Sequence, residues 1–230
     1  RHTRFRNVTG VQTCALPISP DPAPAPQPTQ SPGPPELPVG QRAALLVEAP
    51  EEPSKVKTWY GNVAWRLDTP SGGGLPVLRA DVDITDARLT ATFTITRSAD
   101  ARAAATHILT VRFTPGPDSV VPGVAEIETP SMRIEERPVG DALEGRPAVV
   151  TQNYFFVGLI RDEALTTRNL ELIRTRNWID VPMKLTSGKI AKVTFEKGAT
   201  GERLLAEALE RSEEHTSELQ SRFGISYAVF

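Results

Sequence analysis

The stretch LRADVDITDARLTATFTIT, residues 78–96, contains two runs in which apolar and polar residues alternate strictly. The first run, Leu78 to Ile84, alternates with arginine and aspartate, and the second, Leu89 to Thr96, alternates with threonine. A period of two predicts strands with one packed face and one wet face, as in an antiparallel sheet. The three residues 85–87 between the runs predict a tight turn, so the stretch is expected to form a hairpin.

The same signal continues on both sides of this hairpin. Further strands are expected at 56–68, 107–113, around 125–127, 178–185 and 189–196, and helices at 162–176 and 202–210. Asp162 and Glu163 suit the start of the first helix, because acidic side chains stabilise a helix N-terminus. The pattern indicates a mostly β fold, an antiparallel β-sandwich with one or two covering helices, and an α+β fold is the alternative.

Four segments carry more specific expectations. Residues 41–49 predict either an edge strand or a short helix, because a short apolar run does not distinguish the two. Gly61 marks a possible bulge, and Pro182 favours an edge position for its strand, because proline cannot donate to a central ladder. Residues 148–160 are strongly apolar and are expected to cross the core.

Both ends of the chain resemble translated sequencing adapter. The C-terminal residues 211–230 and the N-terminal residues 1–19 correspond to one primer sequence and its reverse complement, with 222–224 and 5–7 where a single sample index would lie. A gene has no reason to encode an inverted repeat of one primer at its two ends. We therefore expect both flanks to be of non-biological origin and exclude them from the functional reasoning.

The flanks also hold most of the residues that suggest metal or thiol chemistry. Cys14, the single cysteine, lies there, as do His2 and His215, which leaves His107 as the one histidine of residues 20–210. Without the flanks, 21 Lys and Arg stand against 25 Asp and Glu, a net charge of −4. This composition excludes thiolate zinc sites within 20–210, predicts no cofactor, and offers no broad basic surface for nucleic acid.

Residues 20–40, PDPAPAPQPTQSPGPPELPVG, form a proline-rich segment. Such a composition cannot bury enough apolar surface to fold, so an extended and disordered linker is expected. The domain boundaries that follow are adapter at 1–19, linker at 20–40, a β-sandwich domain at 41–210, and adapter at 211–230.

Two sets of polar residues are weak candidates for chemistry. Asp81, Asp83 and Asp86 could offer carboxylate oxygens to calcium, although the spacing of a calcium-binding loop is missing. His107 could serve a metal-independent hydrolase, but no Gly-x-Ser-x-Gly motif in 20–210 identifies a partner serine. We therefore assign no catalytic residue and no metal ligand.

The tryptophans are candidates for ligand stacking. Trp59, Trp65 and Trp178 could stack on sugar rings or on a peptide if they lie exposed together, whereas core packing is the commoner role of large aromatics. A carbohydrate- or peptidoglycan-binding domain is therefore a further alternative.

Several segments resemble an uncharacterised family of bacterial membrane-anchored envelope proteins. They are QRAALLVEAPEEPSKVKTW (41–59), HILTVRFTP (107–115), YFFVGLIRDEA (154–164), NLELIRTRNWIDVPM (169–183) and IAKVTFEKGATGERLLAEAL (190–209), and the resemblance covers nearly all of 41–210. It implies a membrane helix upstream of residue 20, a proline-rich tether and this domain on the periplasmic side of the inner membrane. It supplies no catalytic residues.

The leading hypothesis is therefore a membrane-tethered periplasmic module that binds or scaffolds without catalysis. Its expected partner is an envelope protein or a cell-wall component, and its contact with the membrane would run only through an anchor that precedes residue 20. A spanning helix there would need about 20 apolar residues.

The adapter interpretation is tested by the genomic locus. Long reads prepared without the adapter are expected to contain the codons for 20–210. The codons for 1–19 should be absent before them, and those for 211–230 should be absent after them. A locus that encodes both flanks in frame would contradict the interpretation.

Overall fold

A computed structural model describes residues 41–70, 74–100, 102–135 and 139–224, with side chains to Ser212. The expected linker at 20–40 and the flank at 1–19 lie outside the described residues. The described elements are β1 (Gln41–Glu48), β2 (Val56–Asp68), β3 (Val77–Ile84), a 3-10 turn η1 (Thr85–Ala87), β4 (Leu89–Arg97), β5 (Ala105–Pro115), β6 (Val124–Ile127), β7 (Ser131–Arg133), β8 (Asp141–Ala142), β9 (Gly145–Thr151), β10 (Tyr154–Ile160), α1 (Glu163–Thr175), β11 (Trp178–Leu185), β12 (Ile190–Glu196) and α2 (Gly198–Gly224).

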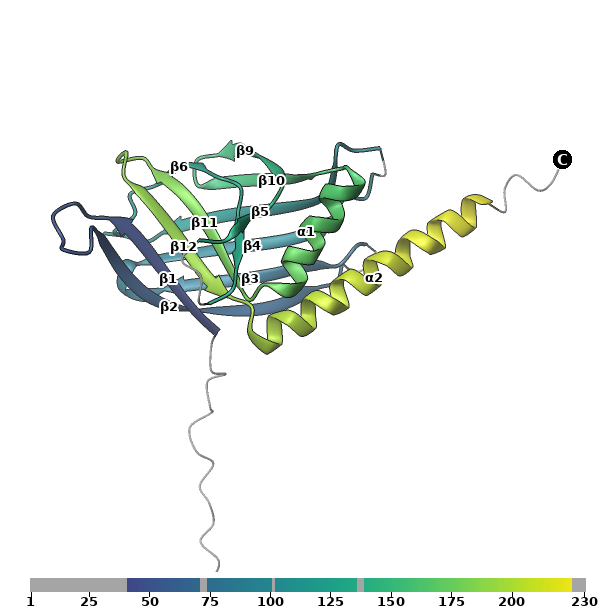
Figure 1. The fold of residues 1–230 in the computed structure, drawn as a ribbon, viewed down its shortest axis with the longest axis horizontal. Coiled ribbons are helices and arrows are strands. Elements are labelled where there is room, and N and C mark those ends of the chain that lie inside the picture. The colour runs from purple at the N-terminus through teal and green to yellow at the C-terminus, as the bar shows by residue number, and fades with distance from the viewer. Residues whose placement is uncertain (1–40, 71–73, 101, 136–138, 225–230) are drawn as a thin grey trace, which may run out of the picture. The chain divides into compact units, whose positions relative to one another are not determined.

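All these strands belong to one antiparallel sheet. Its order is β8-β7-β11-β12-β1-β2-β3-β4-β5-β10-β9, and β6 pairs with β11 beside β7. The sheet curls on itself, so that β11, β12 and β1 cross in front of β3, β4 and β5 (Figure 1). The prediction of a mostly β, antiparallel fold with covering helices is confirmed. The two layers of the expected sandwich come from a single continuous sheet.

The core lies between the two layers. Phe195 on β12 contacts Phe93 on β4, with ring centroids 5.6 Å apart, and Trp65 on β2, at 6.0 Å. These rings are buried together with the apolar residues that alternate along β3, β4 and β5. The inward residues of the front layer therefore pack directly on those of the back layer.

The hairpin of residues 78–96 forms as expected. β3 and β4 pair in continuous register from Val77 opposite Thr96 to Ile84 opposite Leu89. The backbone N–H of Arg88 donates to the carbonyl of Thr85 and closes the turn, with Arg88 in the left-handed region at φ 47°. The period-two pattern thus predicted both the strands and their pairing.

The expectations for β1 and β11 need correction. β1 is neither an edge strand nor a helix, because it pairs with β12 on one side and β2 on the other. β11 is also internal, since it pairs with β12 on one side and with β6 and β7 on the other. Pro182 is tolerated there because the strand that pairs with β11 changes at this residue. Met183 pairs with Ile127 of β6, and Asp180 pairs with Ser131 of β7.

The apolar segment 148–160 does not cross the core as one strand. It divides into the end of β9 and all of β10, which form a hairpin with Asn153 at φ 63° in the turn. Phe155, Val157 and Leu159 of β10 are buried, whereas Val149 of β9 is exposed. Asparagine tolerates the left-handed region, which places a turn within an otherwise apolar run.

The helices close one end of the curled sheet. The side chain of Asp162 accepts the backbone N–H of Leu165 at 3.0 Å and caps α1, which begins at Glu163, close to the expected start. At the other end of α1, the buried Lys197 donates Nζ hydrogen bonds to the carbonyls of Ile173 at 2.7 Å and Arg174 at 3.0 Å. Burial lowers the pKa of Lys197 to about 8, so the side chain is still mostly protonated at neutral pH and suits a helix C-terminus.

The second helix, α2, starts at Gly198 rather than at residue 202 and continues to Gly224. Leu204, Leu205, Ala208 and Leu209 are buried against the sheet, where α2 contacts β2 and β3. Neither described helix combines the length and the apolar character needed to cross a membrane.

Gly61 marks the corner at which the sheet turns from its front layer to its back layer. β2 pairs with β1 over residues 56–63 and with β3 over 62–68, so its partners change next to this glycine. The register through Gly61 is continuous, without the possible bulge. A Cβ atom at this position would overlap the carbonyl oxygen of Asp83 and lie 2.9 Å from the Cα of Ile84. Only glycine allows this close approach.

Substitution of the corner glycine is therefore expected to be severe. Gly61→Val should lower the free energy of unfolding by about 3 kcal/mol or more, because backbone atoms cannot move away as a flexible side chain can. Urea unfolding followed by tryptophan fluorescence measures the change. Ala64→Val, at an exposed position of the same strand, is the control and should stay within about 0.5 kcal/mol of the unmodified protein. Equal effects of both substitutions would contradict the corner role.

Candidate functional site

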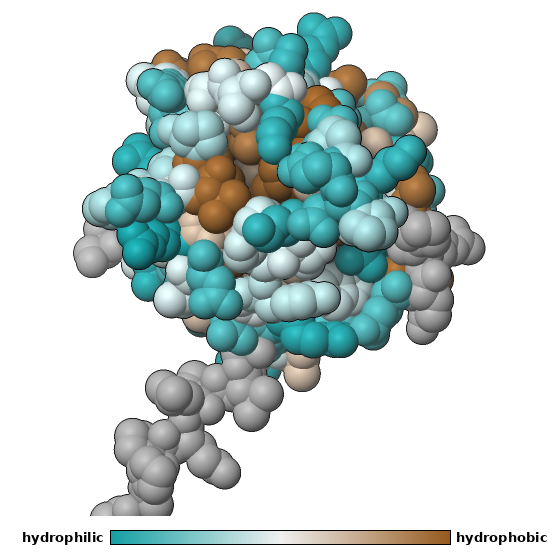
Figure 2. Space-filling view, turned by 90° about the vertical axis from the view of Figure 1, so that its left-hand side faces the viewer, coloured by the Kyte–Doolittle hydropathy of each residue, from teal (hydrophilic) through white to brown (hydrophobic). Residues whose placement is uncertain are grey.

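An apolar groove opens on the outer face of the front layer, next to the β1–β2 loop. Its volume is about 490 Å³, and its lining comes from β1, the start of β2, β11 and β12. The lining residues are Leu46, Val47, Glu48, Lys55, Val56, Pro182, Ile190, Ala191 and Lys192. Figure 2, which faces this end of the molecule, shows apolar side chains gathered in a hollow among polar ones.

Four apolar residues of the lining, Leu46, Val56, Pro182 and Ile190, lie outside the core, whereas Val47 and Ala191 belong to it. In β1, Leu45 and Val47 point inward and are buried, while Leu46 between them points outward. Opposite Leu46, Lys192 shares the outer face, and Ile190 follows at 56% exposure. A strand face that meets water usually carries polar side chains. Apolar side chains at these outward positions therefore leave apolar surface open to solvent.

Three ionisable side chains line the groove, and they differ in their hydrogen-bond and ion-pair partners. Glu48 accepts the backbone N–H of Ile190 at 3.3 Å, which holds its carboxylate against β12. Lys192 Nζ lies 3.0 Å from Asp180. Within the described part of the chain, Lys55 Nζ has no hydrogen-bond or ion-pair partner.

The carboxylate of Asp180 connects the groove to the rest of the outer face. Asp180 is 1% exposed and receives Arg133 Nε at 3.1 Å, Lys192 Nζ at 3.0 Å and the hydroxyl of Thr194 at 2.6 Å. A buried carboxylate with this many donors is held in one position. Two cations share one anion here, so this Asp180 cluster (Arg133, Asp180, Lys192 and Thr194) carries one net positive charge.

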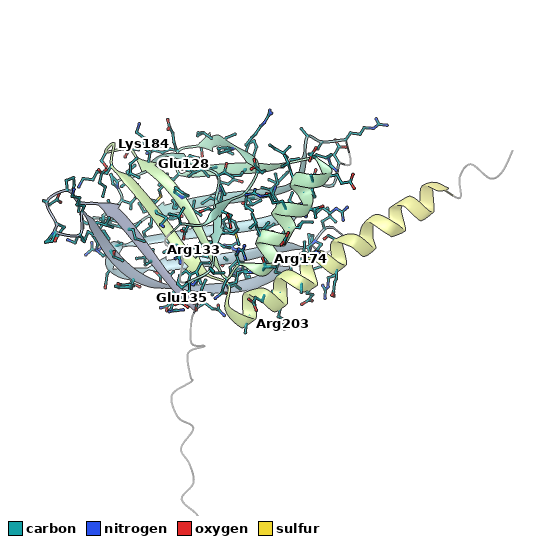
Figure 3. All side chains as sticks on the ribbon, in the orientation of Figure 1. Glu128, Arg133, Glu135, Arg174, Lys184 and Arg203 are labelled. Carbon is teal, nitrogen blue, oxygen red and sulfur yellow. The ribbon has the colours of Figure 1, made fainter. Side chains whose placement is uncertain are left out.

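Trp178 lies close to two guanidinium groups at the opposite end of the same face. The Cζ of Arg42 is 5.1 Å from its ring centroid and the Cζ of Arg133 is 4.8 Å away, and the residue is 7% exposed. Its Nε1 is buried without a hydrogen-bond partner. Figure 3 shows Arg133 and Glu135 toward the start of β1, and Lys184 and Glu128 at the far end of β11. The stack thus links β1, β7 and β11.

The other two tryptophans lie elsewhere. Trp65 is buried in the core, where its Nε1 donates to the carbonyl of Glu196 at 3.0 Å. Trp59 is partly buried against the core, with Lys57 Nζ 5.3 Å from its ring centroid. The structure does not bring the three predicted stacking residues together on one exposed surface.

The three predicted calcium ligands also have other roles. Asp81 pairs with Arg79 at 2.9 Å and with Arg66 at 3.2 Å. Asp83 accepts the hydroxyl of Thr85, and Asp86 is exposed in η1. Over the described ranges, no three His, Cys, Asp or Glu side chains are grouped to hold a metal.

His107 lies beneath α2 rather than in the groove. It is 6% exposed and borders a cavity of about 20 Å³ that Leu205 and Leu209 also line. Its Nδ1 is 3.3 Å from the hydroxyl of Thr106. Burial, and then the positive charges of Arg97, Arg161 and Arg174, lower its pKa to about 4. The imidazole is therefore neutral at neutral pH and enclosed by the helix.

Searches against protein-family models, curated proteins and solved structures found no match for this chain.

Sequence reasoning missed the groove. The one signal available was the run Leu45-Leu46-Val47, which is apolar on both faces of a strand. It indicates a strand whose outer face is also covered, but the neighbours Val56, Pro182 and Ile190 come from distant parts of the chain.

The buried imidazole makes stability depend on pH. Well above pH 6.5, His107 is neutral in both the folded and the unfolded state, so it does not contribute to the pH dependence of stability. As the pH falls from 6.5 toward 4, the unfolded chain binds a proton that the folded protein does not. The free energy of unfolding is therefore expected to fall by up to about 3 kcal/mol over this range.

Urea unfolding at a series of pH values measures this loss. The variant His107→Leu lacks the titrating group, so subtraction of its pH profile removes the contribution of the carboxylates. The difference between the two proteins should change between pH 6.5 and 4 and stay constant above pH 7. Parallel profiles for the two proteins across the whole range would overturn the assignment.

Proposed function

We propose that this domain is a binding module that receives an apolar ligand in the groove of Leu46, Val56, Pro182 and Ile190. The observation that carries the proposal is the apolar lining of an open site of about 490 Å³, in which Ile190 and Val56 remain exposed. This volume lies within the range of small-molecule sites, roughly 300–1,000 Å³. The proposed activity is binding, without a chemical step.

The physical basis of binding would be removal of apolar surface from water. Ile190 and Val56 are 56% and 37% exposed, so each has area left to bury. Burial of an aliphatic side chain stabilises a complex by about 25 cal/mol for each Å² of apolar surface. A ligand that covers the groove would therefore gain affinity without specific hydrogen bonds.

The groove is built on rigid elements, which favours binding. β1 and β12 are paired on both sides, and the Asp180 cluster fixes the position of Lys192 at the groove wall. A site that is already formed loses little conformational entropy when it is occupied. The walls therefore suit a ligand of defined shape.

The proposed setting is the periplasmic side of a bacterial inner membrane. It is supported by the proline-rich segment 20–40, whose composition suits a spacer between a membrane anchor and a domain, and by the resemblance to envelope proteins. In this setting, the partner would be a component of the envelope or cell wall that presents an apolar group.

Binding of a neutral apolar dye tests the groove. N-phenyl-1-naphthylamine is expected to bind one site, and Ile190→Asp should weaken its affinity at least about tenfold, because a carboxylate would have to be desolvated against the dye. Val149→Asp is the matched control, since Val149 is 58% exposed on β9, away from the groove. Equal losses in both variants, or no binding by the unmodified protein, would contradict the proposal.

A further inference from the structure

We infer that the groove ligand is a single-chain amphiphile with an anionic head group, taken up as a monomer, and that Lys55 holds the head. This inference rests on the proposed binding function and adds the chemical class of the ligand. It is based on the charges around the groove, the direction of its apolar lining and the backbone at Lys55.

The ionisable groups around the groove favour an anion. Lys55 has no partner among the described residues, and the Asp180 cluster that includes Lys192 carries one net positive charge. Glu48 is the one acidic side chain in the lining, and the backbone N–H of Ile190 already binds it. The sum is one net positive charge, so a negative head group would be attracted and a positive one repelled.

The apolar lining is elongated across the strands. It extends from Val56 on β2, over Leu46 on β1 and Ile190 on β12, to Pro182 on β11. Three strand spacings correspond to about 14 Å. With C–C bonds of about 1.5 Å, this matches an extended chain of on the order of ten methylene groups. A single alkyl chain fits this length better than a compact ring system.

The backbone holds Lys55 at the end of this path. Its φ of 56° lies in the left-handed region, and the turn is fixed by hydrogen bonds from Ala49 N to Lys55 O at 2.9 Å and from Lys55 N to Glu52 O at 2.8 Å. A lysine in this conformation is strained, whereas glycine or asparagine would not be. The turn therefore fixes the backbone of Lys55 next to Val56 at the end of the groove.

Three probes with the same tail separate the head group from the groove. Dodecanoate, dodecyl maltoside and dodecyltrimethylammonium carry an anionic, a neutral and a cationic head, and each is titrated calorimetrically below its critical micelle concentration. The expected order of affinity is dodecanoate, then maltoside, then ammonium, with about tenfold between the first and the last. Added salt should reduce this ratio.

Two lysine variants locate the head group. Lys55→Gln should lower the affinity for dodecanoate to that for the maltoside and leave the maltoside unchanged. Lys57→Gln is the control, because it removes the same charge two residues away, where Nζ lies over Trp59. Circular dichroism confirms that both variants are folded.

The outcomes distinguish the two proposals. If no probe binds, the proposed binding function fails. If all three bind equally, or if Lys55→Gln and Lys57→Gln behave alike, the groove function stands and the anionic head group is wrong. Sedimentation with anionic phospholipid vesicles is the remaining arm. Vesicle binding without dodecanoate binding would show a membrane-surface site and overturn the inference.

Discussion

The bend of β2 at Gly61 is the constraint on which the rest of the structure depends. The first part of β2 belongs to the front layer and the second part to the back layer, so one strand carries the sheet around the corner. A side chain at Gly61 would collide with the backbone of β3. Because the corner is tight, β12 is brought over β4, and Phe195 reaches Phe93 and Trp65. The core exists because the sheet turns here.

This curl also decides which surface is available for function. The inward faces of both layers fill the core, so a ligand can be bound only on an outward face or at the rim. On the outward face of the front layer, the Asp180 cluster and the Arg42–Trp178–Arg133 stack cover one half with paired charges. The other half is left with Leu46, Val56 and Ile190. The groove is therefore the part of this face where apolar side chains remain exposed, whereas the charged groups on the other half are paired.

The sequence predicted those parts of the fold that depend on neighbouring residues. The alternation in 78–96 specified a hairpin, and Asp162 specified the start of α1, because both signals act within a few residues. The central place of β1 and the change of strand partners opposite Pro182 depend on strands far apart in the chain. The predictions of an edge position for these two strands were therefore wrong. The groove was missed for the same reason: β1 and β12, which form its centre, are separated by about 140 residues yet pair side by side.

The groove lies at the end of β1 that is farther from Gln41. β1 begins at Gln41, where the described domain starts, and the groove lies around Leu46 and Glu48 at its other end. Five residues along the strand separate Gln41 from Leu46 and seven separate it from Glu48, roughly 17–24 Å. The two ends of β1 therefore differ in character, because Arg42 lies near Trp178 at the start of the strand and the apolar groove lies at its end.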